Sequence, residues 1–459
     1  MKELDLTQGK PLKLLLRVAL PLMLGNVFQQ LYTVVDAMIV GSKEGVTALA
    51  ALGAADWFVW LFFGLIQGLT QGFAIPMAQA FGAKDYTKLR RSIAHSTMLS
   101  AFFSVFLAVF AICITPIGLR LLNTPDKVMP LATTYMVIIF IGLPALTGFN
   151  LLSAVLRSLG DGKTPLYAMV IASLSNIFLD WLFVFPLGLG VGGAAAATVI
   201  AQLISCLYCY LRIRTAPYAR FGLADMKPEW KTDASLLRLG IPTGAQNVII
   251  AIGGMLLQSI INQQGMTFIA GFTATNKLYG VLEIAAVSYG YAITSYVGQN
   301  IGAKRPERVR SGVLSGTVLG VLTSLLIMAL MFAGGKWILT CFLSGTPEEI
   351  QASLAIGWEY LTVMASFLPV LYILYVYRSA LYGLGNAVLP MLSGGVEFVM
   401  RVSSALILPG LIGYKGIFYA EISAWAGAAI MLFISYACLM RRFSQKYAGK
   451  AGNNLQTDA

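Results

Sequence analysis

The sequence contains two copies of one unit. Leu-Leu-Arg followed by a proline and an asparagine occurs at residues 15–26 and again at 236–247. The pattern Gln-x-x-Gly-Ala-Lys occurs at 79–84 and again at 299–304, and a glycine five residues before a proline occurs at 160 and at 385. The offsets are nearly equal and extend over about half the chain. In a membrane protein, such doubling is typical of a transporter whose site lies between two lobes.

The composition indicates a membrane protein. Of the 459 residues, 58% are hydrophobic and only 11% are charged, whereas soluble domains carry about 25% charged residues. Apolar stretches recur, each long enough to cross a bilayer as a helix. We therefore predict an all-α membrane protein with twelve transmembrane helices in two pseudo-symmetric six-helix lobes. The expected spans are 14–40, 50–80, 93–116, 131–156, 166–186, 192–212, 236–262, 268–298, 313–335, 355–380, 390–410 and 416–440.

The net charge of +12 is unevenly distributed. Basic residues gather in the amino-terminal segment and in every second loop, while the loops between are nearly bare. This positive-inside pattern predicts a multi-pass protein of the plasma (inner) membrane with both termini in the cytoplasm. No basic patch carries interleaved aromatic residues, which argues against nucleic-acid binding. The basic segments are Lys10–Arg17, Lys84–Arg91, Arg157–Lys163, Arg212–Lys231, Lys304–Arg310 and Arg441–Lys446.

The longest polar connection, 213–235, marks the junction of the two halves. We predict an amino-terminal six-helix lobe at 1–222 that holds the ion-coupling site. A carboxyl-terminal six-helix lobe is expected at 223–443, and a disordered cytoplasmic tail at 444–459. An even number of helices in each half makes the repeats parallel.

Several patterns resemble catalytic or cofactor motifs but have simpler interpretations. Glycines at 188, 190 and 193 suit a tight turn between helices, and residues 162–164 lack the upstream glycine of a phosphate-binding loop. The single histidine, His95, is interpreted as structural, and Cys206 and Cys209 as packing residues. Glycines every fourth residue at 64–72 and at 312–320 favour close helix packing. We expect neither an enzyme nor an organic cofactor.

Ionisable residues inside membrane helices are costly and are therefore functional candidates. Asp36, Asp180 and Thr198 are expected at one depth, and Asn176 shares a helix face with Asp180. Such an all-oxygen cluster can hold a shared proton or a monovalent cation such as sodium.

The repeat provides an internal comparison. Asp36 corresponds to Leu257, Asn176 to Arg401 and Asp180 to Ala405. The second copy keeps the turn residues and loses the acids, so the predicted chemistry is one-sided.

The second half offers weaker candidates. We expect Glu397 to form an ion pair with Arg401 on its own helix. Glu283 has no local partner in the sequence and is a second candidate site. Glu359, Glu421 and Asp56 lie near helix ends, where water reaches them, and rank lower.

Together these residues resemble the multidrug and toxic compound extrusion (MATE) family. The similarity rests on the two six-helix halves, the proline-containing first helix with Gln29, Tyr32 and Asp36, the Asn176/Asp180 pair and the two Gln-x-x-Gly-Ala-Lys loops. It implies a V-shaped carrier that exports cationic amphipathic compounds in exchange for protons or sodium. The implied coupling residues are Asp36, Asn176, Asp180 and Thr198, and the implied substrate contacts are Gln29, Tyr32, Asn150, Met169 and Gln202.

One departure concerns a branch of the family that carries acids in its seventh and tenth helices. Here the seventh helix offers Gln246 and Asn247, and the tenth offers only Glu359 near its outer end. A carboxyl-terminal sodium site of that type is therefore in doubt.

The mechanism we expect is alternating access by a monomer in the bilayer, with Pro21 as a helix hinge because proline frees a backbone carbonyl. An alternative is a flippase for a lipid-linked precursor, which would call for several cavity arginines, whereas only Arg401 is expected deep in a helix. A membrane-embedded enzyme is a third possibility, but no His/Asp or Ser/Lys constellation converges.

Overall fold

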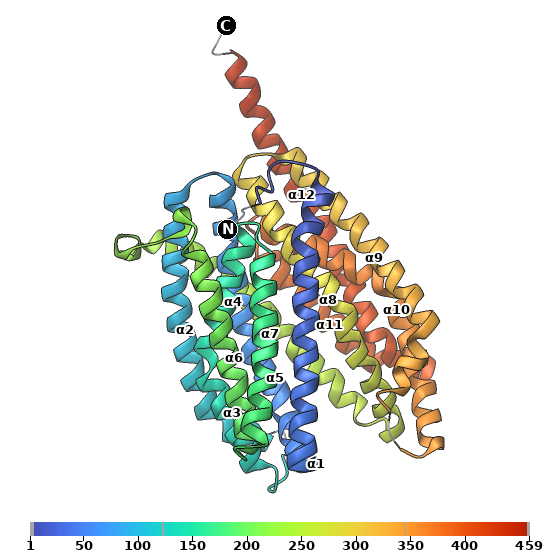
Figure 1. Cartoon of the computed structure of the whole chain (residues 1–459). Coiled ribbons are helices and arrows are strands. Elements are labelled where there is room, and N and C mark those ends of the chain that lie inside the picture. Colours follow the sequence, from blue (N-terminus) through green and yellow to red (C-terminus); the bar gives the residue numbers. More distant parts are fainter. Residues whose placement is uncertain (1–3, 122–123, 344, 457–459) are drawn as a thin grey trace. The chain divides into compact units, whose positions relative to one another are not determined.

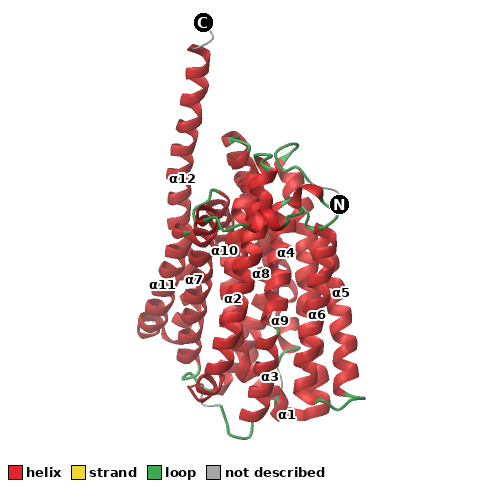
Figure 2. Cartoon of the chain, turned by 90° about the vertical axis from the view of Figure 1, so that its left-hand side faces the viewer, coloured by secondary structure: helices red, strands yellow, loops and turns green. Residues whose placement is uncertain are grey.

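The computed structural model describes residues 4–121, 124–343 and 345–456, and every regular element within them is helical (Figures 1 and 2). Three short 3₁₀ helices lie in loops: η1 (Pro217–Ala219), η2 (Leu223–Met226) and η3 (Gly413–Ile417). The α-helices are α1 (Pro11–Gly82), α2 (Tyr86–Leu121), α3 (Met129–Ile141), α4 (Leu143–Ser158), α5 (Lys163–Val184), α6 (Gly190–Ile213), α7 (Trp230–Ile261), α8 (Met266–Gly302), α9 (Pro306–Thr340), α10 (Pro347–Gly383), α11 (Val388–Ile412) and α12 (Phe418–Gln456).

Helix α1 contains two membrane spans. The break is at Gly45, whose φ of 78° and ψ of −168° are not helical and are accessible mainly to glycine. The spans on either side, Pro11–Gly45 and Phe58–Gly82, correspond to the first two expected spans.

Helices α3 and α4 together form the fourth expected span. They bend by 46° at Gly142, where an added Cβ would lie only 2.2 Å from Cγ2 of Val199. The glycine therefore permits α6 to approach the bend.

The twelve expected spans are confirmed. Nine helical stretches among the described residues are long and apolar enough to cross a membrane, or ten if the bent α3–α4 pair counts as one. One of the nine runs from Val388 to Gln445 and contains both α11 and α12. Helix α8 supplies the remaining span, with 37 residues that include the charged Lys277 and Glu283.

Helix α12 continues to Gln456, so residues 444–456 are helical rather than the disordered tail expected at 444–459. Residues 457–459 lie outside the described part of the chain.

The chain forms two compact units. Unit 1 comprises residues 1–5 and Leu20–Val248, and unit 2 comprises Leu6–Ala19 and Ile249–Ala459. Relative to the expected division at 222/223, each half of the sequence contributes its opening segment to the other unit.

Glycines explain why the start of α7 belongs to unit 1. A Cβ added at Gly68 would lie 2.5 Å from the Cα of Gly244, and one added at Gly72 would lie 2.5 Å from the Cα of Gly240. The Asn247 amide also donates to the carbonyl of Gly64 over 2.8 Å. The packing role expected for the glycines at 64–72 is confirmed.

Polar contacts hold the segment before α7 in unit 1. His95 Nδ1 lies 2.7 Å from Asp233 Oδ1, and Arg91 pairs with Glu229 at 3.5 Å. The histidine is thus a structural link between α2 and the first turn of α7, as expected.

The amino-terminal strap, residues 6–9, is held in unit 2 in a comparable way. The backbone N–H of Leu6 donates to Gln299 Oε1 over 2.9 Å, and the Leu6 carbonyl accepts from Asn300 over 3.1 Å. Arg308 donates to the carbonyls of Leu6 and Gly9, at 3.2 and 3.0 Å. The turn between α8 and α9 therefore holds the segment that leads into α1.

Backbone geometry confirms the internal repeat. Lys84 and Lys304, the final residues of the two Gln-x-x-Gly-Ala-Lys patterns, have φ values of 58° and 57°. Gly160 and Gly385 have φ values of 81° and 82°. The two copies therefore form the same turns despite different neighbours.

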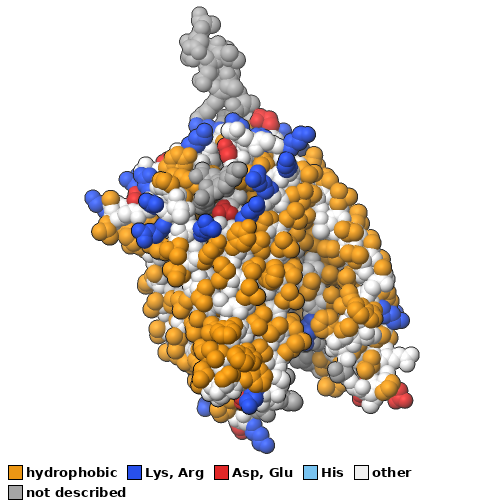
Figure 3. Space-filling model, in the orientation of Figure 1, with side chains coloured by type: hydrophobic (Ala, Val, Ile, Leu, Met, Phe, Trp, Pro, Cys, Tyr) orange, Lys and Arg blue, Asp and Glu red, His pale blue; other side chains and the backbone are white. Residues whose placement is uncertain are grey.

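The helix surfaces match a bilayer environment. Hydrophobic side chains cover much of the surface along the helices, and Lys and Arg side chains gather toward helix ends (Figure 3). On α2, Phe102, Phe106 and Phe110 are 64%, 55% and 48% exposed and stack on one another. Such a stripe suits contact with lipid.

We predict opposite effects of one substitution at two helical glycines. Gly68→Ala inserts a methyl against the backbone of α7 and should lower stability by roughly 1–3 kcal/mol. Gly334→Ala on α9 meets no atom within 4 Å and should be neutral or stabilise by up to about 1 kcal/mol. Thermal unfolding of the purified proteins in one detergent is the measurement. Equal midpoints for the two variants would contradict the close α1–α7 contact.

Candidate ion-coupling and substrate site

Three helices of unit 1 bring most of the expected polar residues together. Asp36 comes from α1, Asn176 and Asp180 from α5, and Thr198 from α6. The two aspartates are 6% and 0% exposed, and Asn176 is 0% exposed. The Asn176 amide donates to Thr198 Oγ1 over 3.4 Å, which links α5 to α6.

This cluster has more buried acceptors than donors. Neither carboxylate oxygen of Asp180 accepts a hydrogen bond from a described residue, and the same holds for the side-chain oxygens of Asn176 and Gln202. The charge of Asp36 acts on Asp180 through space. No ion pair within the described part of the chain involves Asp180. Buried polar atoms normally find a partner, so the arrangement suits a bound proton or cation.

Tyr32 extends the cluster toward the expected substrate contacts. Its hydroxyl is within hydrogen-bonding reach of both Gln29 and Gln202, and the charges of Asp36 and Asp180 act on it. Gln29 and Tyr32 are on α1, seven and four residues before Asp36. Gln202 is one turn after Thr198 on α6. The structure thus gathers three of the five expected substrate contacts beside the acids.

The close approach of α1 to α5 positions Asp36. Ser173 Oγ lies 3.3 Å from the carbonyl of Phe28 and 2.8 Å from that of Met169. A Cβ at Gly25 would lie 2.6 Å from Met169 Sδ. Met169 therefore packs at the α1–α5 contact. Ser173 was missed in the sequence, although it lies three residues before Asn176 on the same helix.

Asn150 is the expected substrate contact that stands apart. It lies on α4, is half-buried, and its amide donates to the carbonyl of Leu146 in its own helix over 3.0 Å. None of the contacts described above includes it.

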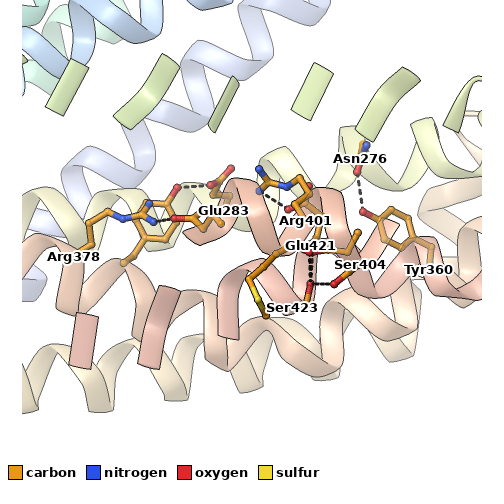
Figure 4. Close-up of polar contacts among 12 residues, drawn as sticks. Asn276, Glu283, Tyr360, Arg378, Arg401, Ser404, Glu421 and Ser423 are labelled. Carbon is orange, nitrogen blue, oxygen red and sulfur yellow. Dashed lines mark hydrogen bonds and ion pairs between the residues drawn. The ribbon is translucent and has the colours of Figure 1, made fainter. Parts of the chain in front are cut away.

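Unit 2 holds a buried ionic network that differs from the expected pairing (Figure 4). Glu397 pairs with Arg378 of α10, and Arg401 pairs with Glu421 of α12 at 2.8 Å. The predicted Glu397–Arg401 pair within α11 is therefore wrong. Both side chains point to neighbouring helices. There each buried charge meets an opposite charge, which compensates for the water it has lost. Arg378, at 7% exposed, was missed as a deep arginine.

Glu283 has a hydrogen-bond partner on another helix, which the sequence could not indicate. The Tyr375 hydroxyl of α10 donates to it, and Tyr279, one turn earlier on α8, lies beside it. Three carboxylates and two guanidinium groups make up the network, and Glu283 is the carboxylate without a guanidinium of its own. It is half-buried, whereas Glu397 is only 4% exposed.

Two of the three lower-ranked acids, Glu359 and Glu421, can be placed, whereas the side chain of Asp56 lies outside the described part of the structure. Glu359 pairs with Lys415 and accepts a hydrogen bond from Tyr414 over 3.1 Å. It is partly exposed but lies inside α10, which begins at Pro347, rather than near the helix end that the sequence suggested. Glu421 pairs with Arg401 and is 17% exposed in the first turn of α12, so its expected place near a helix end is confirmed.

A doubled, all-helical plan with acids buried inside apolar helices defines a membrane transporter. The MatE family model matches residues 21–182 and 242–407, together more than half of the chain. The two matches begin at Pro21 and Pro242, which are equivalent in the internal repeat. The chain belongs to the MatE family.

Similar proteins cover nearly the whole chain. The probable multidrug resistance protein YpnP of Bacillus subtilis is 31% identical over 91% of this chain and 93% of its own length. The probable multidrug resistance protein NorM of Thermotoga maritima is 26% identical over 96% of this chain and 94% of its own. A crystal structure described as MATE in complex with MaL6 shares the fold, with a TM-score of 0.90, 23% identity and coverage of 97% of this chain and 100% of that chain.

We predict that removing Arg378 alone destabilises unit 2 more than removing Arg378 and Glu397 together. Arg378→Met leaves Glu397 as an uncompensated buried charge and should destabilise unit 2 by roughly 3–5 kcal/mol. Arg378→Met combined with Glu397→Leu removes both charges and should recover most of that loss. Thermal unfolding of the single and double variants tests this. Additive losses in the double variant would contradict the direct pairing.

Proposed function

We propose that this protein is a secondary active transporter that exports cationic amphipathic compounds in exchange for protons or sodium ions. The observation that carries the proposal is Asp180, which is fully buried, has two oxygens without a described donor and lies under the influence of Asp36. The names of YpnP and NorM, two probable multidrug resistance proteins, support export of drugs or toxins. The proposed location is the plasma membrane, with both termini in the cytoplasm, and no cofactor besides the coupling ion is invoked.

The coupling step follows from electrostatics. Two neighbouring carboxylates inside a membrane cannot both remain ionised at low cost. A proton can be shared between Asp36 and Asp180, and a sodium ion can be coordinated by them with the oxygens of Asn176 and Thr198. Binding replaces one positive charge with another, so the coupling ion and a cationic drug can exclude each other.

Helix α1 supplies the proposed movement. Pro21 has no backbone N–H, so the carbonyl of Arg17 loses its helical donor and bending costs less. The boundary between the two compact units falls at Ala19/Leu20, beside this proline. Ion binding at Asp36 biases the helix toward whichever conformation binds the ion more tightly.

The second unit contributes Glu283 as a proposed contact for the positive group of the substrate. It carries the one carboxylate in the network without a guanidinium partner, and it is half-buried rather than sealed. The rings of Tyr279 and Tyr375 accompany it and can provide a favourable face for an organic cation.

The ion pairs of the buried arginines argue against the flippase alternative. A pyrophosphate headgroup requires guanidinium groups that are free to bind it. Arg378 and Arg401 each form an ion pair with a carboxylate inside unit 2. Their nitrogens without a described partner, Arg378 Nε and Arg401 Nε and Nη1, are buried.

We predict that Asp36→Asn and Asp180→Asn each reduce ion-coupled export to background while the protein still reaches the membrane. Either change removes the charge that the coupling ion neutralises. Efflux of a fluorescent cation from liposomes, with proton and sodium gradients imposed separately, measures the effect and identifies the ion.

The matched control is Asp126→Asn, the same substitution at an exposed loop residue, which should transport like the wild type. Normal gradient-driven export by the Asp36→Asn protein would exclude Asp36 as the coupling acid.

Glu283→Gln should instead weaken substrate binding and leave coupling intact. We expect the KM for a monocationic dye to rise by roughly tenfold, the factor that corresponds to about 1.4 kcal/mol of lost interaction. Transport of an uncharged substrate should be unaffected. Glu307→Gln at an exposed position of α9 is the control, and an unchanged KM in the Glu283→Gln protein would remove Glu283 from the substrate site.

A further inference from the structure

Unit 2 has a second feature, separate from its buried ionic network. A cavity of about 290 Å³ opens between α9, α10 and α12. Arginines from two helices border it, Arg310 in the second turn of α9 and Arg441 near the end of the apolar part of α12. Both are exposed. Its other principal lining residues are Leu314, Tyr377, Phe433 and Tyr436.

The walls of the cavity are aromatic. Tyr377 of α10 packs edge-on against Phe433, with ring centroids 5.2 Å apart, and lies 5.3 Å from the ring of Tyr436. The Tyr436 hydroxyl is buried, and no described residue forms a hydrogen bond with it. A buried hydroxyl normally has a partner, so this one is available to a ligand.

The charge and the surroundings of the cavity indicate the class of ligand. No acidic residue is among those that line it, and Glu307, the nearest acid along α9, is not one of them. Leu314 and Phe433 are 66% and 51% exposed, as residues that face lipid are. The cavity thus combines two guanidinium groups at a helix end with an apolar flank. Basic pockets between helices at the membrane surface are suited to anionic lipid headgroups.

We propose that this cavity binds the phosphate headgroup of an anionic phospholipid from the adjacent leaflet. Arg310 and Arg441 provide planar donors for the phosphate oxygens, and the Tyr436 hydroxyl donates a further hydrogen bond. An acyl chain then follows the exposed side chains of Leu314 and Phe433. A soluble anion would not use this apolar flank.

The position of the cavity gives the lipid a structural role. Its wall residue Tyr377 directly precedes Arg378, which forms the buried pair with Glu397. A lipid that fixes Tyr377 also fixes the turn of α10 that carries this ion pair.

The test uses the full-length chain in mixed micelles that contain phosphatidylglycerol and phosphatidylcholine in equal amounts. Bound lipid is identified by mass spectrometry after purification. The wild type should retain phosphatidylglycerol selectively, and Arg310→Gln and Arg441→Gln should each reduce its apparent affinity roughly fivefold. Tyr436→Phe, which keeps the ring and removes the hydroxyl, should reduce it to a smaller degree.

The matched control is Arg442→Gln, which removes the same charge from the next residue of α12, outside the cavity lining. Arg310→Lys/Arg441→Lys keeps the charge and should retain most of the selectivity, which separates lipid binding from misfolding. Equal losses in the Arg441→Gln and Arg442→Gln proteins, or equal retention of both lipids by the wild type, would overturn the proposal.

Discussion

Asp180 of α5 is fully buried, and no described donor reaches either of its oxygens. A permanently ionised carboxylate in such surroundings is costly, since the side chain is out of reach of bulk solvent and no described basic side chain pairs with it. The packing of α1 in unit 1 adds a second acid, Asp36, to these surroundings. Ser173 and Gly25 bring α1 against α5, which sets Asp36 where its charge acts on Asp180. The proposed coupling ion would offset this cost by supplying one small positive charge.

The two units solve the burial of charge differently on the same helical plan. Unit 1 leaves acceptors without donors, whereas unit 2 matches Glu397 and Glu421 with Arg378 and Arg401. Duplication preserved the turns at Lys84 and Lys304, because backbone geometry there is a requirement of the fold. It did not preserve the acids. The doubled architecture therefore carries two electrostatic environments. In unit 1 the buried Asp180 has no ion-pair partner among the described residues, and in unit 2 Glu397 and Glu421 are each paired with an arginine.

The sequence was sufficient for the number of spans, the repeat, and the convergence of Asp36, Asn176, Asp180 and Thr198, because each depends on hydropathy or on spacing along a helix. It was insufficient where helix rotation decides. The i,i+4 spacing of Glu397 and Arg401 suggested a local pair, but their side chains turn toward α10 and α12. The bend at Gly142 was also missed, since a glycine inside an apolar stretch looks the same whether a helix continues or breaks there. The expected role of Asn150 has no counterpart in the contacts of the cluster.

Each unit is completed by a segment from the opposite half of the sequence: residues 6–19 in one case and 223–248 in the other. This exchange is the arrangement of a domain-swapped dimer whose two chains have been joined. An ancestral single copy would have had to lend its opening segment to a twin and accept the twin's in return. Cutting the present chain at the linker would therefore separate each unit from a segment that packs within it. The two fragments would have to meet in the same bilayer to rebuild both units.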